Sequence, residues 1–182
     1  MLRSILALAL IAGPAFAQDD GPGPNLSIDV TGAANGTIVI DLLPDVAPKH
    51  VAQMTALATA GAYDGVIFHR VIDGFMAQTG DVQFGKAGGD TAQAGMGQSD
   101  MPNLPAEFSD IPFARGIVGM ARSQDPDSAN SQFFIMFAPG DFLNGQYTVV
   151  GRVISGMEVV DAIAKGEPPE TPDVMTKVTV AP

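Results

Sequence analysis

Three polar side chains lie in apolar stretches where each could act on a ligand. Arg70 belongs to the run Val66-Ile-Phe-His-Arg-Val71, and Gln78 and Gln132 belong to two further apolar runs. Because a strand sends alternate side chains to opposite faces, Arg70 is either exposed and inert at a rim or held as a fixed charge. A buried glutamine needs hydrogen-bond partners and a guanidinium offers five donors, so the glutamines favour the second interpretation.

Several large apolar side chains accompany these positions. In Gln132-Phe-Phe-Ile, alternation sends Phe133 and Phe134 to opposite faces, so one should be core while the other can line the same side as Arg70. A site of this kind would grip an apolar group beside a positive charge. It lacks an obvious nucleophile and base, so the chemistry to expect is conformational. Further large side chains could each be core or pocket: Phe75, Met76, Phe137, Phe142 and Leu143.

Other catalytic chemistries find little support in the residue types. The chain has two histidines, no cysteine and no tryptophan. A Ser-His-Asp hydrolase could be imagined from His69 with Asp73 or Asp81, but no segment resembles a nucleophile elbow. Two isolated histidines without cysteine make a poor zinc site. Gly85-Lys86-Ala87 lacks the spacing of a phosphate-binding loop.

The first 17 residues follow the pattern of a secretory signal peptide. Arg3 supplies positive charge, Ile5 to Ile11 is an uninterrupted apolar run, and Ala15-Phe-Ala17 has the small-x-small form of a cleavage site. The run is shorter than the ~20 residues that a membrane span needs. A buried N-terminal helix is the alternative. We expect cleavage before Gln18, and the absence of cysteine excludes a lipid anchor there.

Composition predicts one globular domain that does not bind nucleic acid. The 182 residues are 46% hydrophobic, with a mean hydropathy of +0.21 and no internal repeat. Cleavage after residue 17 would leave 8 basic and 20 acidic residues, a formal charge of −12. Phosphate backbones repel a protein of this charge.

Patterning predicts a mainly β protein in which the helices plug the open ends of an antiparallel barrel. Residues 18–25 are read as a flexible mature terminus, followed by a single domain over 26–182.

Asn35-Gly36 indicates a hairpin, and Asn35-Gly36-Thr37 also matches a glycosylation sequon. The irregular stretch 85–113 is long enough to suggest a binding or positioning role. The strands are expected at Leu26–Val30, Thr37–Leu43, Val66–Val71, Phe75–Thr79, Ile117–Ala121, Gln132–Phe137, Thr148–Val153 and Val174–Val180.

Two helices are expected. Pro48 can occupy the first turn of one helix, which ends at Gly61. Ser155-Gly-Met-Glu158 reads as a capping box at the start of the other, with Gly166 as its C-terminal cap. The apolar stripes are Val51, Met54, Leu57 and Ala58 in the first helix, and Met157, Val160 and Ile163 in the second.

These motifs resemble the signature of the cyclophilins, the cyclosporin-binding family of peptidyl-prolyl cis-trans isomerases. The segment Phe68-His-Arg-Val-Ile-x-Gly-Phe-Met-x-Gln-x-Gly-Asp81 carries most of the resemblance, which extends from about Leu26 to Val180. Met120-Ala-Arg-Ser-Gln-Asp-Pro126 is similar to the bacterial branch. Further matching blocks are Gly116–Ala121, Ser128–Phe134, Phe142–Gly145, Val150–Val153 and the helix that begins at Gly156.

The resemblance implies a fold and a site. The fold would be a closed eight-stranded antiparallel β-barrel capped by two α-helices. The catalytic arginine would be Arg70, with Gln78 beside it. Gln132 would be the glutamine at the start of the motif Gln132-Phe-Phe134. Backbone groups of Ala121 and Arg122 would hold the substrate in an extended arrangement. The pocket for the substrate proline would consist of Phe75, Met76, Phe134 and Leu143.

Three positions depart from the family pattern. Phe142 stands where many eukaryotic members have tryptophan, so an indole donor is missing and weak cyclosporin binding is expected. Tyr147 occupies a position often held by histidine, and its hydroxyl could still donate to a substrate. Thr79 replaces a glycine beside the site.

The implied function is cis–trans isomerisation of X-Pro bonds during the folding of exported, periplasmic proteins. The substrates would be proline-containing polypeptides, the enzyme would be monomeric, and neither a metal nor an organic cofactor would be needed. A proline-binding chaperone or scaffold with little catalysis is the alternative. Retention of both Arg70 and Gln78 favours the enzyme, because binding alone needs only the apolar pocket.

Overall fold

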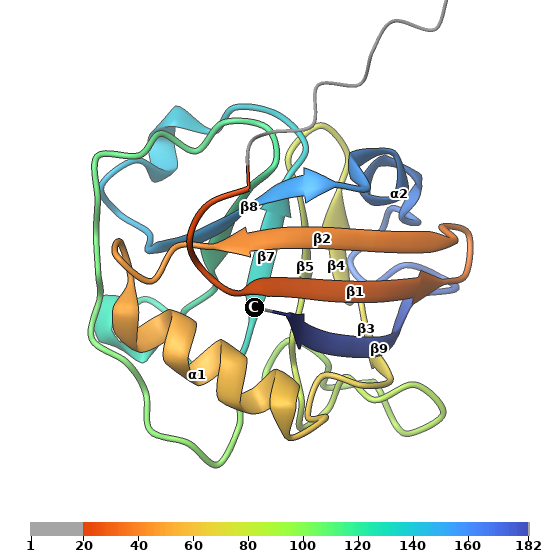
Figure 1. Ribbon diagram of the computed structural model, residues 1–182. Helices are drawn as coiled ribbons and strands as arrows, with labels where there is room; N and C mark the ends of the chain where they lie inside the picture. The colour runs from red at the N-terminus through yellow and green to blue at the C-terminus, as the bar shows by residue number, and fades with distance from the viewer. Residues whose placement is uncertain (1–19, 182) are drawn as a thin grey trace, which may run out of the picture.

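The computed structural model describes residues 20–181, which form a single curled antiparallel sheet with two α-helices (Figure 1). The predicted signal peptide, residues 1–17, lies outside the described residues. The sheet has nine strands in the order β3-β9-β1-β2-β8-β6-β7-β5-β4. They are β1 (Asn25–Thr31), β2 (Gly36–Leu42), β3 (Val66–Ile67), β4 (Arg70–Ile72), β5 (Met76–Thr79), β6 (Ile117–Met120), β7 (Phe133–Met136), β8 (Val149–Ser155) and β9 (Val174–Ala181).

The predicted strand over residues 66–71 is divided in two, which corrects the expected count of eight. Val66 and Ile67 pair with β9, whereas Arg70 begins the pairing with β5. Phe68 and His69 separate the two pieces, and both are buried. The halves therefore form the two edges of the sheet, so the chain itself joins these edges, and within residues 20–181 no strand-to-strand pairing closes the barrel.

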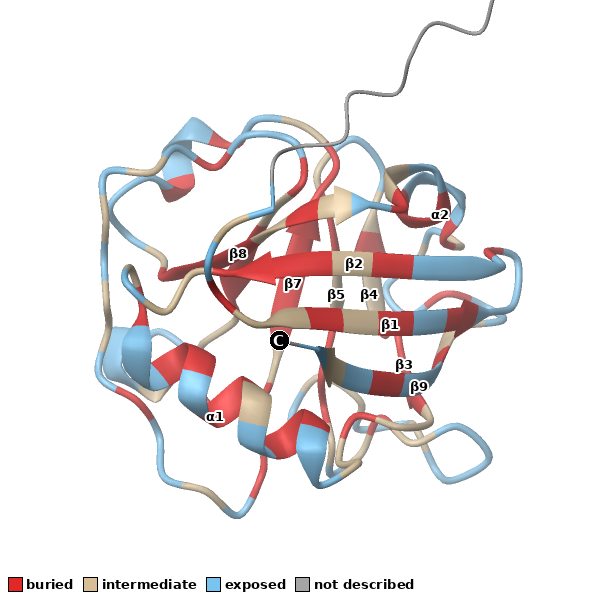
Figure 2. Cartoon of the chain, viewed as in Figure 1, coloured by how far each residue is buried: buried red, intermediate tan, exposed pale blue. Residues whose placement is uncertain are grey.

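The core consists of two clusters, one on each side of the sheet. The larger cluster fills the inside of the curl and includes at least one residue from each strand, among them Ile28, Ile40 and Phe133. The smaller cluster includes Met76 and Phe134. Figure 2 shows the buried residues concentrated along the strands and on one side of the longer helix. In β5 and β7, therefore, side chains on one face belong to the main core and side chains on the other face belong to the smaller cluster.

The first helix, α1 (Pro48–Thr59), forms as predicted. Proline lies in its first turn, and its buried side chains include all four members of the expected stripe. These residues pack into the main core beside β9. In the view of Figure 1, α1 and the second helix, α2 (Met157–Ala162), lie at opposite sides of the sheet.

The predicted caps of α2 were wrong. Ser155 is the last residue of β8, and the N-cap is Gly156, whose φ of +86° lets the chain turn directly from strand to helix without a side-chain cap. The helix ends at Ala162 with Ile163 as its C-cap, so Gly166 is not part of it. Gly166 instead pairs with Val71.

The N-terminal hairpin and the long irregular stretch complete the fold. β1 and β2 are joined by residues 32–35, in which Asn35 donates to the carbonyl of Gly32 at 2.8 Å. Ahead of β1, the N–H of Gly21 donates to the carboxylate of Asp41. Residues 85–113 contain isolated bridges but no regular strand or helix. No helix within residues 20–181 combines the length and apolar character needed to cross a bilayer.

Candidate active site

A single row of paired residues across the sheet carries the predicted site. Arg70 in β4 is directly opposite Gln78 in β5, Gln78 is opposite Phe134 in β7, and Phe134 is opposite Gly119 in β6. Residues opposite each other in antiparallel strands point to the same face. The cation, the amide and the aromatic ring therefore lie side by side. Gly119 leaves room for the ring, since a Cβ there would lie 2.6 Å from Phe134.

Alternation along β7 separates core from pocket, as the sequence predicted. Phe133 is fully buried in the main core, where its ring contacts Tyr63 edge-on at 5.6 Å. Phe134 is 5% exposed and stacks on Phe113, with ring centroids 5.7 Å apart. Phe134 is thus the member of the pair that shares the face of Arg70.

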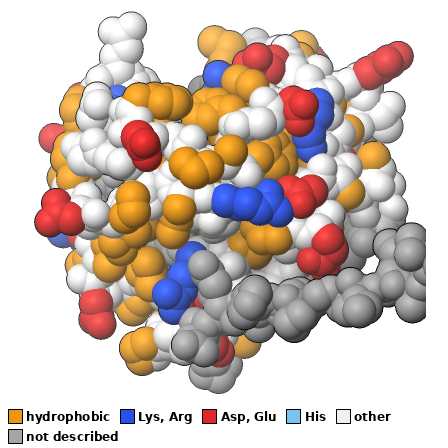
Figure 3. Space-filling model, turned by 90° about the horizontal axis from the view of Figure 1, so that it is seen from above, with side chains coloured by type: hydrophobic (Ala, Val, Ile, Leu, Met, Phe, Trp, Pro, Cys, Tyr) orange, Lys and Arg blue, Asp and Glu red, His pale blue; other side chains and the backbone are white. Residues whose placement is uncertain are grey.

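An apolar pocket of about 250 Å³ lies on this face. Its lining includes the four residues expected for the proline pocket: Phe75, Met76, Phe134 and Leu143. Arg70, Gln78, Ala121 and Arg122 stand at its margin together with Phe142 and Tyr147. Figure 3 shows hydrophobic side chains gathered on the upper face of the molecule around several Lys and Arg side chains.

Two contacts fix the guanidinium of Arg70, whose side chain is 42% exposed. Nη1 donates to Oε1 of Gln78 at 3.4 Å, as the sequence predicted. Nε donates to Oε2 of Glu167 at 2.7 Å, a contact that the sequence analysis missed. The partly exposed side chain of Arg70 is therefore held by two partners, as in the second of the two interpretations of its position.

The orientation of both glutamine amides follows from a chain of hydrogen bonds. Nε2 of Gln132 donates to the carbonyls of Gly95 and Gly97 at 3.0 and 2.8 Å. Carbonyls only accept, so the amide oxygen of Gln132 must face the other way, where it accepts from Nε2 of Gln78 at 2.9 Å. Gln78 then presents its own oxygen to Arg70. The carbonyls of Gly95 and Gly97 thus determine which group donates and which accepts in each hydrogen bond from Gln132 through Gln78 to the guanidinium of Arg70.

The chain of amides begins at a buried carboxylate. Asp81 is fully buried and accepts from the N–H groups of Gly95 and Gly97 at 2.7 and 2.9 Å, besides those of Gln83 and Phe84. It therefore shapes the loop whose carbonyls orient Gln132. A hydrolase role for Asp81 finds no support, because its oxygens are occupied by backbone donors.

A second, polar cavity of about 390 Å³ extends the groove beyond Arg122. It shares Gln78, Ala121 and Arg122 with the apolar pocket and was not predicted from the sequence. Gln132 lines this cavity and is not part of the apolar pocket. Met96, which is 81% exposed, stands at its margin. Its other lining residues include Gly95, Gly97, Gln98, Asn103, Ser128, Asn130 and Ser131.

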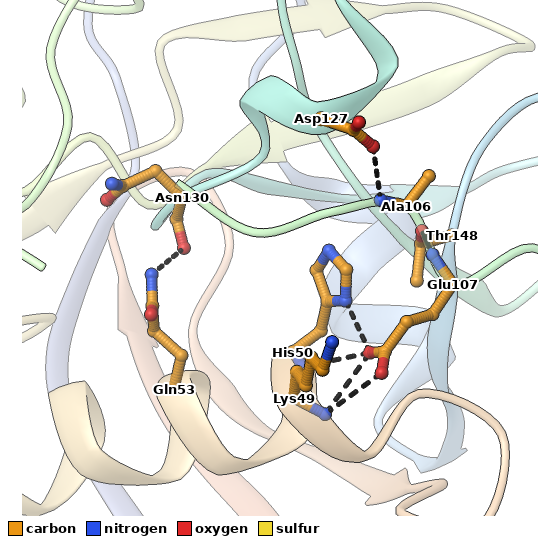
Figure 4. A network of polar contacts seen from close by, with 8 residues as sticks. All are labelled: Lys49, His50, Gln53, Ala106, Glu107, Asp127, Asn130 and Thr148. Atoms are coloured by element: carbon orange, nitrogen blue, oxygen red, sulfur yellow. Dashed lines mark hydrogen bonds and ion pairs between the residues drawn. The ribbon is translucent and has the colours of Figure 1, made fainter. Parts of the chain in front are cut away.

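Polar contacts join helix α1 to Asn130, which lines the polar cavity, and to the irregular stretch (Figure 4). Gln53 donates to the carbonyl of Asn130 at 3.1 Å. Glu107, from the long irregular stretch, accepts from the N–H groups of Lys49 and His50 and contacts Nδ1 of His50 at 2.6 Å. Because Glu107 binds the first turn of α1, the helix and the irregular stretch are fastened together.

The remaining predicted residues lie at the margin of the apolar pocket. Arg122 stacks over the ring of Tyr147 at 4.3 Å and donates to the carbonyls of Ser123 and Gln146. The N–H of Ala121 donates to the carbonyl of Gln132 at 2.9 Å. That N–H is therefore occupied, so a substrate contact at Ala121 falls to its carbonyl oxygen. Phe142 is 66% exposed at the lip of the apolar pocket, 5.5 Å from the ring of Phe75.

His69 and Thr79 are buried and line neither cavity. His69 is 4% exposed beside Gly95, and burial lowers its pKa against the opposing effect of the Asp81 carboxylate. Thr79 is fully buried, and its hydroxyl donates to the carbonyl of Ile67 at 2.9 Å. It therefore tethers β5 to β3. Within residues 20–181, no three His, Asp or Glu side chains are grouped as a metal site requires.

Comparisons with known proteins agree with this geometry. A relative from Brucella suis named "Probable peptidyl-prolyl cis-trans isomerase" is 61% identical over 153 residues, which cover 80% of this chain and 78% of the relative. A peptidyl-prolyl cis-trans isomerase of Arabidopsis thaliana is 41% identical over 130 residues, covering 71% of this chain and 78% of the plant protein.

Solved structures show the same fold. The crystal structure of a cyclophilin from Hirschia baltica has a TM-score of 0.75 and 28% identity, covering 89% of this chain and 75% of that one. A Cryptosporidium parvum isomerase, crystallised in the presence of the dipeptide Ala-Pro, has a TM-score of 0.73 and 26% identity, covering 87% of this chain and 99% of that one. The family model described as "Cyclophilin type peptidyl-prolyl cis-trans isomerase/CLD" matches residues 26–181, so the chain belongs to the cyclophilin-type peptidyl-prolyl cis-trans isomerases.

Proposed function

We propose that this isomerase uses Arg70 as its catalytic group and the apolar pocket as the seat of the substrate proline ring. The observation that carries the proposal is the guanidinium at the margin of the apolar pocket, where Gln78 and Glu167 fix its position. A planar cation fixed beside a pocket of ring size can act on the bond that leads into the bound ring.

The chemistry follows from the electronic structure of the amide bond. Rotation has a barrier of ~18–20 kcal/mol because the nitrogen lone pair is shared with the carbonyl. When an X-Pro bond twists, the lone pair returns to the prolyl nitrogen, which becomes a better hydrogen-bond acceptor. A guanidinium N–H aimed at that nitrogen binds the twisted state more tightly than either planar state, and this difference lowers the barrier.

The groove on either side would position the rest of the peptide. The apolar pocket anchors the ring while the preceding carbonyl swings. The carbonyl of Ala121 and the backbone of Arg122 lie between the two cavities and would bind the extended chain. The polar cavity would then accept residues farther from the proline.

A protease-coupled isomerisation assay on wild type and Arg70→Ala tests the proposal. Loss of one transition-state donor should lower kcat/KM by a factor on the order of 10² to 10³, or about 2.7–4 kcal/mol. Activity within twofold of wild type would refute catalysis by Arg70. If wild type binds a proline peptide but does not accelerate isomerisation, the scaffold interpretation is the correct one.

We further propose that the substrates are exported proteins and that the enzyme works as a periplasmic monomer. The signal-like sequence of residues 1–17 supports this location. Intact-mass measurement of the protein recovered from the cell envelope fraction should give a chain that begins at Gln18. An unprocessed chain in the cytosol would overturn the location, and light scattering would detect any oligomer.

A further inference from the structure

The contact between Arg70 and Glu167 joins residues 97 positions apart in the sequence. Glu167 binds the guanidinium at Nε, whereas Gln78 binds it at Nη1. The two partners therefore approach from different sides of a planar group, which fixes both its place and its plane. Within residues 20–181 the Nη2 group has no hydrogen-bond partner, so its N–H groups remain for a substrate.

The fold delivers Glu167 to this place through the loop 164–173. Gly166 and Val71 exchange two backbone hydrogen bonds, each 2.8 Å long, which sets Glu167 beside Arg70. The base of the loop is fastened by Asp173, which is fully buried and accepts from the N–H of Ala164 at 2.7 Å. The backbone pairing therefore places Glu167 next to Arg70, and the contact itself is made by their two side chains.

Gly166 is required for this arrangement. Its φ is +149°, and a Cβ at this position would lie 2.6 Å from Cα of Pro169. A larger residue would displace the loop at the point where it pairs with β4. The loop conformation that presents Glu167 is thus specified by the sequence around it.

The two contacts differ in strength. At 2.7 Å, the bond to Glu167 is short and charge-assisted, whereas the bond to Gln78 is 3.4 Å long and its acceptor is neutral. Glu167 therefore contributes more to the orientation of the guanidinium than Gln78 does. Both members of the ion pair are about half exposed, at 42% and 52%, so the pair contributes little to global stability.

We infer that Glu167 is a positioning residue for Arg70, an inference that rests on the proposed catalysis by Arg70. It aims the Nη N–H groups at the prolyl nitrogen and thereby acts on the transition state more than on the bound ground state. Loss of Glu167 should therefore lower kcat and leave KM and peptide affinity nearly unchanged. The carboxylate of Glu167 also partly neutralises the positive charge of Arg70, which by itself would lower kcat. Solvent at this exposed site weakens that charge effect.

The test compares three single variants with wild type, using kcat and KM for a proline peptide and calorimetric binding of the same peptide. Glu167→Ala should lower kcat roughly 5- to 20-fold with KM within twofold. Glu167→Gln keeps an acceptor oxygen and should recover most of kcat. Glu170→Ala removes an equal charge from the same loop at an exposed position without an ion pair to Arg70, and should match wild type.

A double variant separates this inference from the proposed function. If Glu167 acts through Arg70, Arg70→Ala combined with Glu167→Ala should be no slower than Arg70→Ala alone. Wild-type or raised kcat in Glu167→Ala, alongside a slow Arg70→Ala, would overturn the positioning role only. An active Arg70→Ala would instead overturn the proposed function. A Glu167→Ala protein whose KM rises while kcat is unchanged would show ordinary substrate binding, and the inference would be wrong.

Discussion

Arg70 and Gln78 are directly opposed in the antiparallel pair of β4 and β5. This register brings a guanidinium and an amide from different strands onto one face, and the next pairing adds the ring of Phe134. A shift of one residue would turn every one of these side chains to the other face of the sheet. The geometry of the proposed site is therefore a property of strand register, and changes within the row should alter activity in separable ways.

Substitution of Phe134, which lines the apolar pocket, should affect catalysis, whereas substitution of the adjacent core residue Phe133 should not. Phe134→Leu and Phe133→Leu each remove part of a buried ring and should cost roughly 1–2 kcal/mol of stability. Only Phe134→Leu should lower kcat/KM per folded molecule, because only that ring lines the apolar pocket. Thermal unfolding measured beside turnover separates the two effects. Equal activity losses in both variants would show that the pocket assignment is wrong.

Breaking the chain of amides at Gln132 should loosen Gln78. Gln132→Leu removes the oxygen that accepts from Gln78 and leaves the carbonyls of Gly95 and Gly97 without their side-chain donor. We expect kcat/KM to fall roughly tenfold, since a small displacement of a catalytic group is costly. Unsatisfied carbonyls should cost about 1–3 kcal/mol of stability. Gln93→Leu, at an exposed position of the irregular stretch, is the control and should change neither quantity.

Cyclosporin affinity should respond to the residue at the lip of the apolar pocket. The side chain of Phe142 is exposed and has no polar atom, so Phe142→Trp supplies an indole N–H without disturbing the core. One regained buried hydrogen bond contributes roughly 0.5–1.5 kcal/mol, up to about tenfold in Kd. Titration calorimetry with wild type, Phe142→Trp and Phe108→Trp gives the comparison. Phe108 is exposed but lines neither cavity, so an equal gain there would mean that the effect is non-specific.

The meeting of Arg70, Gln78 and Phe134 in one site was implied by the resemblance to the cyclophilins. Alternation in the sequence predicted most of the strands, and that either Phe133 or Phe134 could share the face of Arg70. It could not predict which strand pairs with which, because a period of two fixes only the side to which a residue points. For that reason the division of residues 66–71 between two edges was missed. The contact of Glu167 with Arg70 was missed because it depends on a loop whose position is set by the pairing of Gly166 with Val71.

The capping box predicted at Ser155 shows a second limit. A motif of the right residue types was present, but the chain enters α2 directly from β8 through Gly156 in a left-handed conformation. The tertiary turn determined the helix start, and the local motif had no free helix end to cap. The polar cavity was missed for a related reason. Part of its lining comes from the irregular stretch and the rest from residues 121–132 and Gln78, and a sequence pattern could not reveal that these separate segments meet.

Acid should weaken the junction between α1 and the irregular stretch. Burial alone would raise the pKa of Glu107, but hydrogen bonds from the His50 side chain and from the N–H groups of His50 and Lys49 outweigh it, so the net pKa is lowered. A carboxyl whose pKa is lower in the folded state stabilises the fold above its unfolded pKa, near 4.5, and loses that contribution as pH falls through the folded value.

Glu107→Gln should therefore reduce stability at pH 7 by about 1–2 kcal/mol, the range for losing a charged partner at a helix N-terminus. Its disadvantage relative to wild type should shrink as pH falls below about 4.5, because wild type then loses the same contribution. Urea unfolding at pH 7, 5, 4 and 3 measures the difference. Asp110→Asn, at an exposed position of the same stretch, provides the control. A difference between wild type and Glu107→Gln that stays constant across this range would mean that the carboxylate charge does not stabilise the junction.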